Sequence, residues 1–454
     1  MFARPVLSAS TCKYAHLRFS PAQRLWRAPI KYPCRAMATS SKVHLTPSQQ
    51  AVFYVPGITS DTANTTSELL QENYEKHHIF FNHAGFHNHI VHHLLSLFAL
   101  NATPAELMQG WNDNVSYQRP PVPLKQSVVT DMHDPQKYKT YLGNENHYHN
   151  FLVFFQEEIN QKGWQEVLNE YIFKGDERAD DMLVRMFGGI LHPIIHLGFG
   201  VEFEQPAIIA EALAQAAVHG NREASHLIES EKAAKAHSLD TRSGTTIVQL
   251  VEEIYADMER GSRNRAKHSS QVHVTEENLE EKTAEMINAV VYFTGAAQHP
   301  PHQIKFDFFN IHAVNLSIFF CSFLRQSWLS IPNKIRLLEW KIRMDLAMYA
   351  SPRPPKLLLD EIANYKSKKD SSWEDIFKRV KTYHDDGHAC KLVRALANGE
   401  QVCKKYEHKD GFVIKGDMWR KLGNMAIDSV EAGSPDYVRS GAWSSVPLRD
   451  QSRI

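Results

Sequence analysis

The chain has 454 residues, and its 51 Lys and Arg residues balance its 51 Asp and Glu residues. A nucleic-acid-binding protein usually has a basic bias or a basic stripe, and outside the N-terminus this chain has neither. The hydrophobic content of 43% and the mean hydropathy of −0.40 are typical of a globular protein with one large core or two smaller ones. The unusual feature is the 25 histidines. Some should lie on the surface, and a subset is expected to converge on a site.

The N-terminal segment has the composition of a targeting sequence. No acidic residue precedes Asp61, whereas several Arg and Lys residues precede Met37. This composition predicts an organelle transit peptide, and the alternative is a protein that starts at Met37. We set residues 1–40 apart as a basic extension, which leaves the location open between the cytoplasm and the mitochondrion.

From about residue 64 onward the sequence has helical periodicity. A Thr/Ser cluster suited to capping opens a predicted helix over 64–78, and a second helix runs from residue 88 until Asn101 and Pro104 stop it. Residues 146–173 predict two helices separated at Gly163. Further helices are predicted over 178–203, 205–221, 307–329, 333–351, 372–403 and 417–430.

Three stretches depart from this pattern. Residues 261–285 are polar and predict a surface insertion, and residues 411–416 alternate as a strand would. The longest apolar run, 311–324, is too short for a membrane helix and contains His312, so we expect a buried helix and no membrane association. The sequence therefore predicts an all-α protein, with one large multi-helix domain over 41–454 in one or two lobes.

The cysteines exclude two kinds of site. None has a CxxC spacing or a paired arrangement, which argues against a disulfide framework and against a cysteine zinc site. A reducing compartment fits this usage. The residues are Cys12, Cys34, Cys321, Cys390 and Cys403.

The stretch "FHNHIVHHLL" (86–95) contains four histidines. On a helix, His87 would share a stripe with Ile90 and Val91, whereas His89, His92 and His93 would face the other side. One helix face cannot present all four to one ion. The alternative for each is an ordinary core or surface histidine.

Two further clusters place histidines on apolar helices. His192 and His196 are four residues apart in "LHPIIHLG", which puts both on one face, but the Glu of a zinc-protease H-E-x-x-H motif is missing. His312 and Asn315 are polar residues on an apolar helix that starts near Asp307, and a buried polar group needs a partner.

The stretch "DDGHACKLVRAL" (385–396) spaces His388 and Lys391 three residues apart in apolar surroundings. Burial makes a lysine lose its proton more easily. The neutral amine can then capture carbon dioxide and become a carboxylate ligand. The alternative is that Lys391 pairs with Asp385 or Asp386.

Several enzyme classes lack their motifs. The chain has no G-x-S-x-G elbow, no P-loop and no G-x-G-x-x-G after a strand, which argues against a serine hydrolase, a P-loop enzyme and a flavin or dinucleotide in a Rossmann fold. Two Glu-x-x-His pairs, Glu75 with His78 and Glu223 with His226, keep a di-iron helical bundle as a minor alternative.

Four stretches, 77–120, 191–219, 305–319 and 385–396, together resemble the questin oxidase-like family of fungal oxidoreductases, over about residues 50–440. The resemblance implies oxygen insertion into, or oxidative opening of, an anthraquinone-like polyketide in secondary metabolism. The outcome would be of Baeyer–Villiger or dioxygenase type, with NADPH as the possible reductant. In the wider family it also implies a mononuclear non-haem iron held by histidines and a carboxylated lysine.

This resemblance assigns roles to residues around a buried, histidine-lined site. The small-molecule partners would be a polycyclic aromatic substrate and O2, while the oligomeric state stays open. Gln118 and Arg119, together with Asp307, could contact the quinone or phenol oxygens of the substrate. The candidate metal ligands are His87, His92, His192, His196, His312 and Lys391, and the candidate catalytic residues are His89, Arg119, Asp307 and His388.

Two other functions compete with the iron oxygenase. One is a metal-free, NADPH-dependent oxidase in which the histidines act as acids and bases. The other is a helical protein that binds a hydrophobic metabolite without chemistry, although binding alone has little need of so many clustered histidines.

Overall fold

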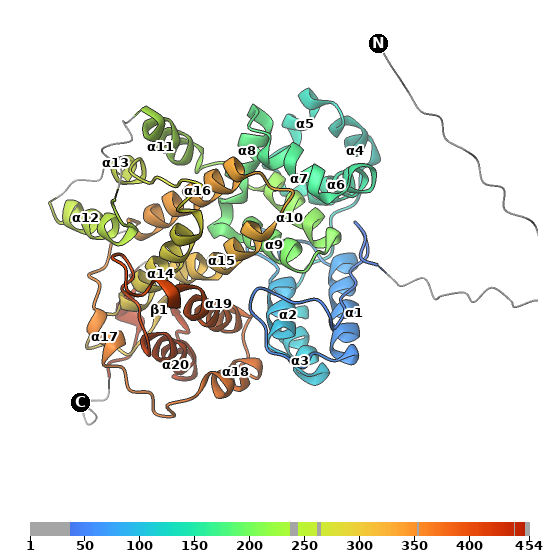
Figure 1. Ribbon diagram of the computed structural model, residues 1–454. Helices are drawn as coiled ribbons and strands as arrows, with labels where there is room; N and C mark the ends of the chain where they lie inside the picture. Colours follow the sequence, from blue (N-terminus) through green and yellow to red (C-terminus); the bar gives the residue numbers. More distant parts are fainter. Residues whose placement is uncertain (1–36, 237–243, 261–264, 352–353, 440, 450–454) are drawn as a thin grey trace, which may run out of the picture. The chain divides into compact units, whose positions relative to one another are not determined.

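The fold is described from a computed structural model, which describes residues 37–236, 244–260, 265–351, 354–439 and 441–449. The predictions for the basic extension before residue 37 lie outside these residues. Helices dominate the described chain (Figure 1), so the all-α prediction is confirmed.

The helices follow one another along the chain. The N-terminal part contains α1 (Ser60–Lys76), α2 (Ile90–Ala99), α3 (Pro104–Val115), α4 (Gln126–Met132), α5 (Pro135–Tyr141), α6 (Tyr148–Lys162), α7 (Trp164–Leu168) and α8 (Glu177–Met186). The middle contains α9 (Gly188–Glu202), α10 (Pro206–Val218), α11 (Ala224–Ala236), α12 (Ile247–Glu259), α13 (Arg265–Ser269) and α14 (Leu279–Ala296). The C-terminal part contains α15 (Phe308–Arg325), α16 (Ile331–Tyr349), α17 (Leu359–Ala363), α18 (Trp373–Lys381), α19 (His388–Cys403) and α20 (Met418–Glu431). A short parallel pair is formed by β1 (Phe306–Asp307) and β2 (Tyr437–Val438).

Local sequence explains where the first helices begin and end. The Thr59 side chain accepts a hydrogen bond from the backbone of Thr62 and caps α1. Thr103 and Glu106 form a capping box at the start of α3. Between α2 and α3, Asn101 adopts a left-handed conformation with φ of 56°, which Asn tolerates well.

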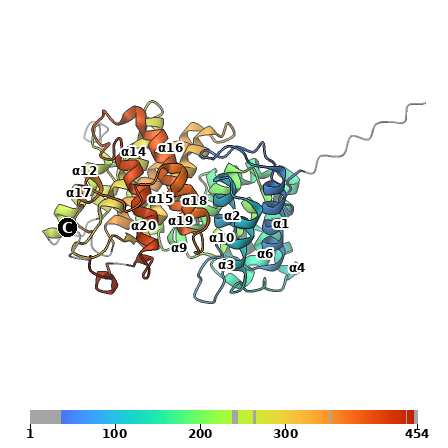
Figure 2. The ribbon, with the colours of Figure 1, turned by 90° about the horizontal axis from the view of Figure 1, so that it is seen from below.

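Four helices pack in a ring around the centre of the protein. Helix α2 contacts α9, α9 contacts α15, α15 contacts α19, and α19 contacts α2 again. Helix α10 covers α9 and packs on α6, while α14 packs on α15 and α19 (Figures 1 and 2). Segments hundreds of residues apart in the sequence therefore meet at this ring.

Two of the departures predicted from the sequence turn out differently. The polar stretch 261–285 is not a surface insertion in its described part, because Val272 and Val274 are buried and α14 starts at Leu279. Residues 411–416 form a loop rather than a strand, and the Asn288 side chain accepts hydrogen bonds from the backbone of Val413 and Ile414.

Helix α15 is longer than the apolar run suggested. Among the described helices, α15, with 18 residues, is the one that is long and apolar enough to cross a membrane. The bent pair α8–α9 would also be long and apolar enough if the two helices formed one span. The apolar stretch of α15 is 72% buried inside the protein, as expected for a core helix.

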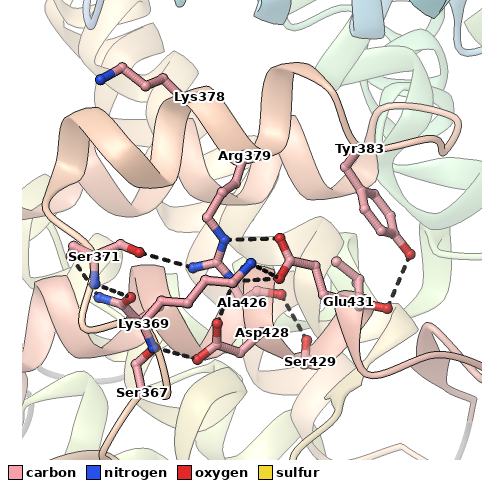
Figure 3. A network of polar contacts seen from close by, with 12 residues as sticks. Ser367, Lys369, Ser371, Lys378, Arg379, Tyr383, Ala426, Asp428, Ser429 and Glu431 are labelled. Atoms are coloured by element: carbon pink, nitrogen blue, oxygen red, sulfur yellow. Dashed lines mark hydrogen bonds and ion pairs between the residues drawn. The ribbon is translucent and has the colours of Figure 1, made fainter.

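A network of charges joins α18 to α20 (Figure 3). The Arg379 guanidinium binds the carboxylates of Asp428 and Glu431 on α20, and Lys369 donates to Glu431 at 2.9 Å. The network holds α18 immediately before the turn that leads into α19. It therefore fixes one edge of the central ring of helices.

Candidate functional site: a buried histidine cluster

Four buried histidines from four distant segments meet inside the ring of helices. His89 precedes α2, whereas the other three lie on α9, α15 and α19. The Nε2 atoms of His89 and His192 are 2.8 Å apart, and those of His388 and His312 are 3.2 Å apart. We call His89, His192, His312 and His388 the histidine cluster.

Each ring in the cluster has its other nitrogen occupied. The Nδ1 atom of His192 donates to the Gly189 carbonyl at 2.6 Å, and that of His312 donates to the Phe308 carbonyl at 2.6 Å. The remaining two Nδ1 atoms, on His89 at 2.8 Å and on His388, share the carboxylate of Asp386. Carbonyl and carboxylate oxygens only accept hydrogen bonds, so every Nδ1 carries the proton.

The cluster is neutral, and its free lone pairs face one another. Burial lowers the pKa of all four imidazoles, that of His388 to about 3. A neutral ring protonated on Nδ1 presents an unprotonated Nε2. Nitrogen lone pairs as close as those of His89 and His192 repel unless a cation lies between them.

Asp386 supplies the negative charge next to this cluster. Burial by itself would raise its pKa, but His388 and His89 hold the pKa well below its usual value. The carboxylate therefore stays ionised and keeps both rings in one orientation, as carboxylates behind metal-bound histidines do.

The start of α9 is strained in a way that places His192. Gly189, Ile190 and Leu191 have positive φ angles of 53°, 57° and 65°, so regular helix resumes only at His192. A Cβ on Gly189 would lie 2.4 Å from the His219 ring and 2.9 Å from His87 Nε2. Only glycine fits here, and its carbonyl is the acceptor for His192.

These residues fit a transition-metal ion. His89, His192 and His388 each offer one ligand atom, and these three atoms lie within 4.8 Å of one another. Among the described residues, this is the one group of three or more His, Cys, Asp or Glu side chains that could hold a metal ion. Metal–imidazole bonds are about 2.0–2.1 Å long, which places neighbouring ligand nitrogens roughly 3 Å apart. Imidazole donors backed by carboxylate and carbonyl groups suit iron, zinc or copper.

A second pair of predicted ligands lies beside the cluster. His92 is fully buried with neither ring nitrogen bonded to a described residue, and its ring centre is 5.2 Å from that of His196. The Nε2 atom of His196 is 3.1 Å from a carboxylate oxygen of Glu211. Both side chains therefore keep nitrogen atoms free for a ligand.

Lys391 is also buried next to the histidines. Burial lowers its pKa to about 8. Burial is the largest cause that lowers the pKa of His89, His92, His312 and His388, and the charge of Lys391 lowers each of these pKa values further. The alternative, a hydrogen-bonded pair between Lys391 and an aspartate, is not formed among the described residues: Asp386 binds two histidines, and Asp385 accepts from the backbone of Gly387 and Ala389.

The helix-face argument for the first stretch does not hold, because α2 starts only at Ile90. Residues 80 and 87 form a β-bridge, so His87 lies outside the helix. Its ring stacks on His192 at 3.8 Å, and its Nε2 is 2.8 Å from that of His219. Three histidines of this stretch therefore reach one region, while His93 contacts Asn114.

Three other predicted residues have contacts away from the cluster. Arg119 donates to the Phe80 carbonyl and to Glu145, and Gln118 donates to the Asn114 carbonyl. Asp307 accepts from the backbone of Phe309 and Asn310 and caps α15. Their roles in catalysis stay predictions.

The Glu-x-x-His pairs do not meet. Glu75 is exposed and accepts from Gln71 within α1, whereas His226 lies on α11 next to the Arg343 carbonyl. The described residues therefore do not assemble a di-iron site from these pairs.

Known proteins match this chain over most of its length. Residues 86–396 match the family described as Questin oxidase-like. The Baeyer-Villiger monooxygenase dmxR6 of Cryptosporiopsis is 38% identical over 424 residues, which cover 87% of this chain and 95% of the relative. The questin oxidase of Aspergillus terreus is 36% identical, over 87% of this chain and 93% of the relative. The oxidoreductase AflY of Aspergillus parasiticus is 37% identical, over 90% of this chain and 88% of the relative.

A predominantly helical protein with this buried cluster and these relatives is an oxidoreductase. The chain belongs to the Questin oxidase-like family.

Proposed function

We propose that the protein inserts oxygen into an anthraquinone-like polyketide, or opens its ring oxidatively, at a mononuclear non-haem iron. The observation that carries the proposal is the set of four imidazoles whose Nδ1 protons are all engaged and whose Nε2 lone pairs converge. The names of the relatives, questin oxidase and Baeyer-Villiger monooxygenase, support the type of reaction.

For the Baeyer–Villiger outcome, one oxygen atom of O2 enters between a carbonyl carbon and the adjacent ring carbon. The other oxygen atom leaves as water, which takes up two electrons and one proton from a hydride donor such as NADPH and a second proton from solvent. For a dioxygenase outcome, both oxygen atoms enter the product. Iron bound at the site would supply the activation of O2.

The residues of the chain set the conditions for this chemistry. His89, His192 and His388 would hold the ion, and His312 lies next to them. A carboxylated Lys391 would add an oxygen ligand. Asp386 accepts a hydrogen bond from Nδ1 of His89 and from Nδ1 of His388, which keeps a proton on each of these atoms and orients both rings.

The surroundings of the cluster exclude water and provide flat walls. Phe308 packs its ring 4.8 Å from His312 and 5.1 Å from His388, and Phe199 stacks on His92 at 5.3 Å. Aromatic walls suit a planar substrate, because stacked rings bury a large area without polar groups.

Metal analysis combined with an activity assay tests the proposal. Purified wild-type protein should contain about one iron per chain and consume O2 with a hydroxyanthraquinone. His192→Ala and His388→Ala should lose both iron and turnover. His384→Ala is the matched control, because this histidine is 71% exposed and pairs with Asp113.

Two results would favour the other functions. Full turnover by metal-free protein that still requires NADPH would replace the iron mechanism with acid–base catalysis by histidines. Tight binding of the hydroxyanthraquinone with no turnover in the presence of iron, O2 and reductant would make the protein a binding protein.

A further inference from the structure

The C-terminal segment reaches the histidine cluster. Strand β2 pairs in parallel with β1, with Tyr437 opposite Phe306, and β1 leads directly into α15, which carries His312. The Tyr437 ring is 5.9 Å from the His388 ring and 6.2 Å from the Phe308 ring. The residues of this strand lie outside the 86–396 region that matches the family.

Tyr437 and Arg439 flank the aromatic ring that covers the cluster. The Arg439 guanidinium lies 4.7 Å from the centre of the Phe308 ring, and Phe308 itself packs on His312 and His388. The segment 437–439 therefore lies against the aromatic ring that packs on two histidines of the cluster.

The hydroxyl of Tyr437 is buried without a hydrogen-bond partner among the described residues. A buried polar group that stays unsatisfied destabilises the folded protein, so this hydroxyl calls for an explanation. Two tyrosines with buried side chains do have partners: Tyr349 donates to the Pro355 carbonyl at 2.9 Å, and Tyr171 donates to Glu158 at 2.8 Å.

The chemistry of this hydroxyl is that of a donor. A phenol has an ordinary pKa of about 10, so the Tyr437 hydroxyl stays protonated at physiological pH. It can offer its proton to an acceptor but does not serve as a base.

We propose that Tyr437 contacts the substrate and that its hydroxyl donates a hydrogen bond to a quinone or phenol oxygen held next to His388. The proposal rests on the proposed function for the class of substrate. A polyoxygenated planar ring stacked near Phe308 would bring an acceptor to the hydroxyl, and the strand β2 would fix the position of the donor.

Two phenylalanine variants test this assignment. Tyr437→Phe removes a hydroxyl that bonds to no described residue, so the folded protein should be as stable as the wild type or more stable. Its affinity for a hydroxyanthraquinone should fall about three- to tenfold, with a matching rise in KM. Tyr349→Phe, the control, should lose stability through its missing hydrogen bond and keep its affinity.

Fluorescence titration with two ligands sharpens the test. The wild type and Tyr437→Phe should differ with the hydroxyanthraquinone and bind anthracene, which lacks oxygen, equally well. Equal affinity of the wild type and Tyr437→Phe for the hydroxyanthraquinone would overturn the proposal, whether or not the variant is less stable.

The outcome is separable from that of the proposed function. If the wild type binds the hydroxyanthraquinone without opening it, the proposed function fails, and the difference in affinity still decides the role of Tyr437. If the wild type does not bind the hydroxyanthraquinone, both proposals are wrong.

Discussion

Among the individual residues, Asp386 determines how two imidazoles of the cluster are held, because one carboxylate accepts from both His89 and His388. An amide has only one acceptor oxygen, so Asp386→Asn should leave one ring without its acceptor. We expect bound metal and turnover to fall roughly 10–100-fold while the protein stays folded. Metal stoichiometry and the rate of O2 consumption measure this.

The matched control is Asp113→Asn, which changes another aspartate–histidine pair, at the exposed His384. It should keep the metal content and the rate of the wild type. Normal metal binding in Asp386→Asn would contradict the role of the carboxylate.

The pKa of Lys391, about 8, leads to a second prediction, which concerns the pH dependence of iron uptake. Below this pH the ammonium form dominates and cannot add carbon dioxide, and above it the neutral amine dominates. Iron uptake by metal-free protein in bicarbonate should therefore increase as the pH rises through about 8. Uptake should be slow without bicarbonate.

Lys391→Arg should show neither dependence, because a guanidinium stays charged throughout. Uptake by the wild type that is independent of both pH and bicarbonate would exclude a carboxylated lysine. Iron content after a fixed time, measured over a pH series, separates these outcomes.

At the level of a single helix, the strained start of α9 leads to the third prediction. Gly189→Ala combines a left-handed φ with clashes against His219 and His87. Strain and overpacking together should lower the free energy of unfolding by about 2–5 kcal/mol. The variant should also lose turnover, since Gly189 orients His192.

Gly175→Ala separates strain from collision, because Gly175 also has a positive φ, of 78°, but a Cβ there would meet nothing within 4 Å. It should lose only about 1–2 kcal/mol and keep full activity. Equal losses in the two variants would mean that packing around Gly189 does not matter. Urea unfolding of both variants gives the comparison.

At this scale the sequence predicts that a helix exists better than it predicts where the helix begins. The Thr/Ser cluster at residues 65–67 was expected to cap a helix over 64–78, but it lies inside α1, which begins at Ser60 and is capped by Thr59. The helix-face argument for His87 and His89 was wrong because a β-bridge between residues 80 and 87 is a contact that helical periodicity does not encode. The polar stretch 261–285 misled for a similar reason, since partners elsewhere bury Val272 and Val274.

For the whole molecule, the limit of sequence reasoning is pairing over long distances. The spacing within 385–396 singled out His388, but nothing in it showed that Asp386 bonds to His89, 297 residues away. His219 and Tyr437 were missed because neither belongs to a histidine-rich motif. Their relevance appears only when the helices and β2 bring them next to His87 and His388.

This assembly from distant segments leads to the last prediction, which concerns metal and global stability. The ligands converge only in the folded chain, so an ion that binds the native state stabilises it by about 4 kcal/mol at a free concentration of 1,000 times its Kd. A chelator should therefore lower the melting temperature of the wild type, and added iron should restore it. His192→Ala and His388→Ala should melt at one temperature with or without iron, whereas His384→Ala should respond as the wild type does. A melting temperature of the wild type that ignores both chelator and metal would show that the converging histidines serve packing alone.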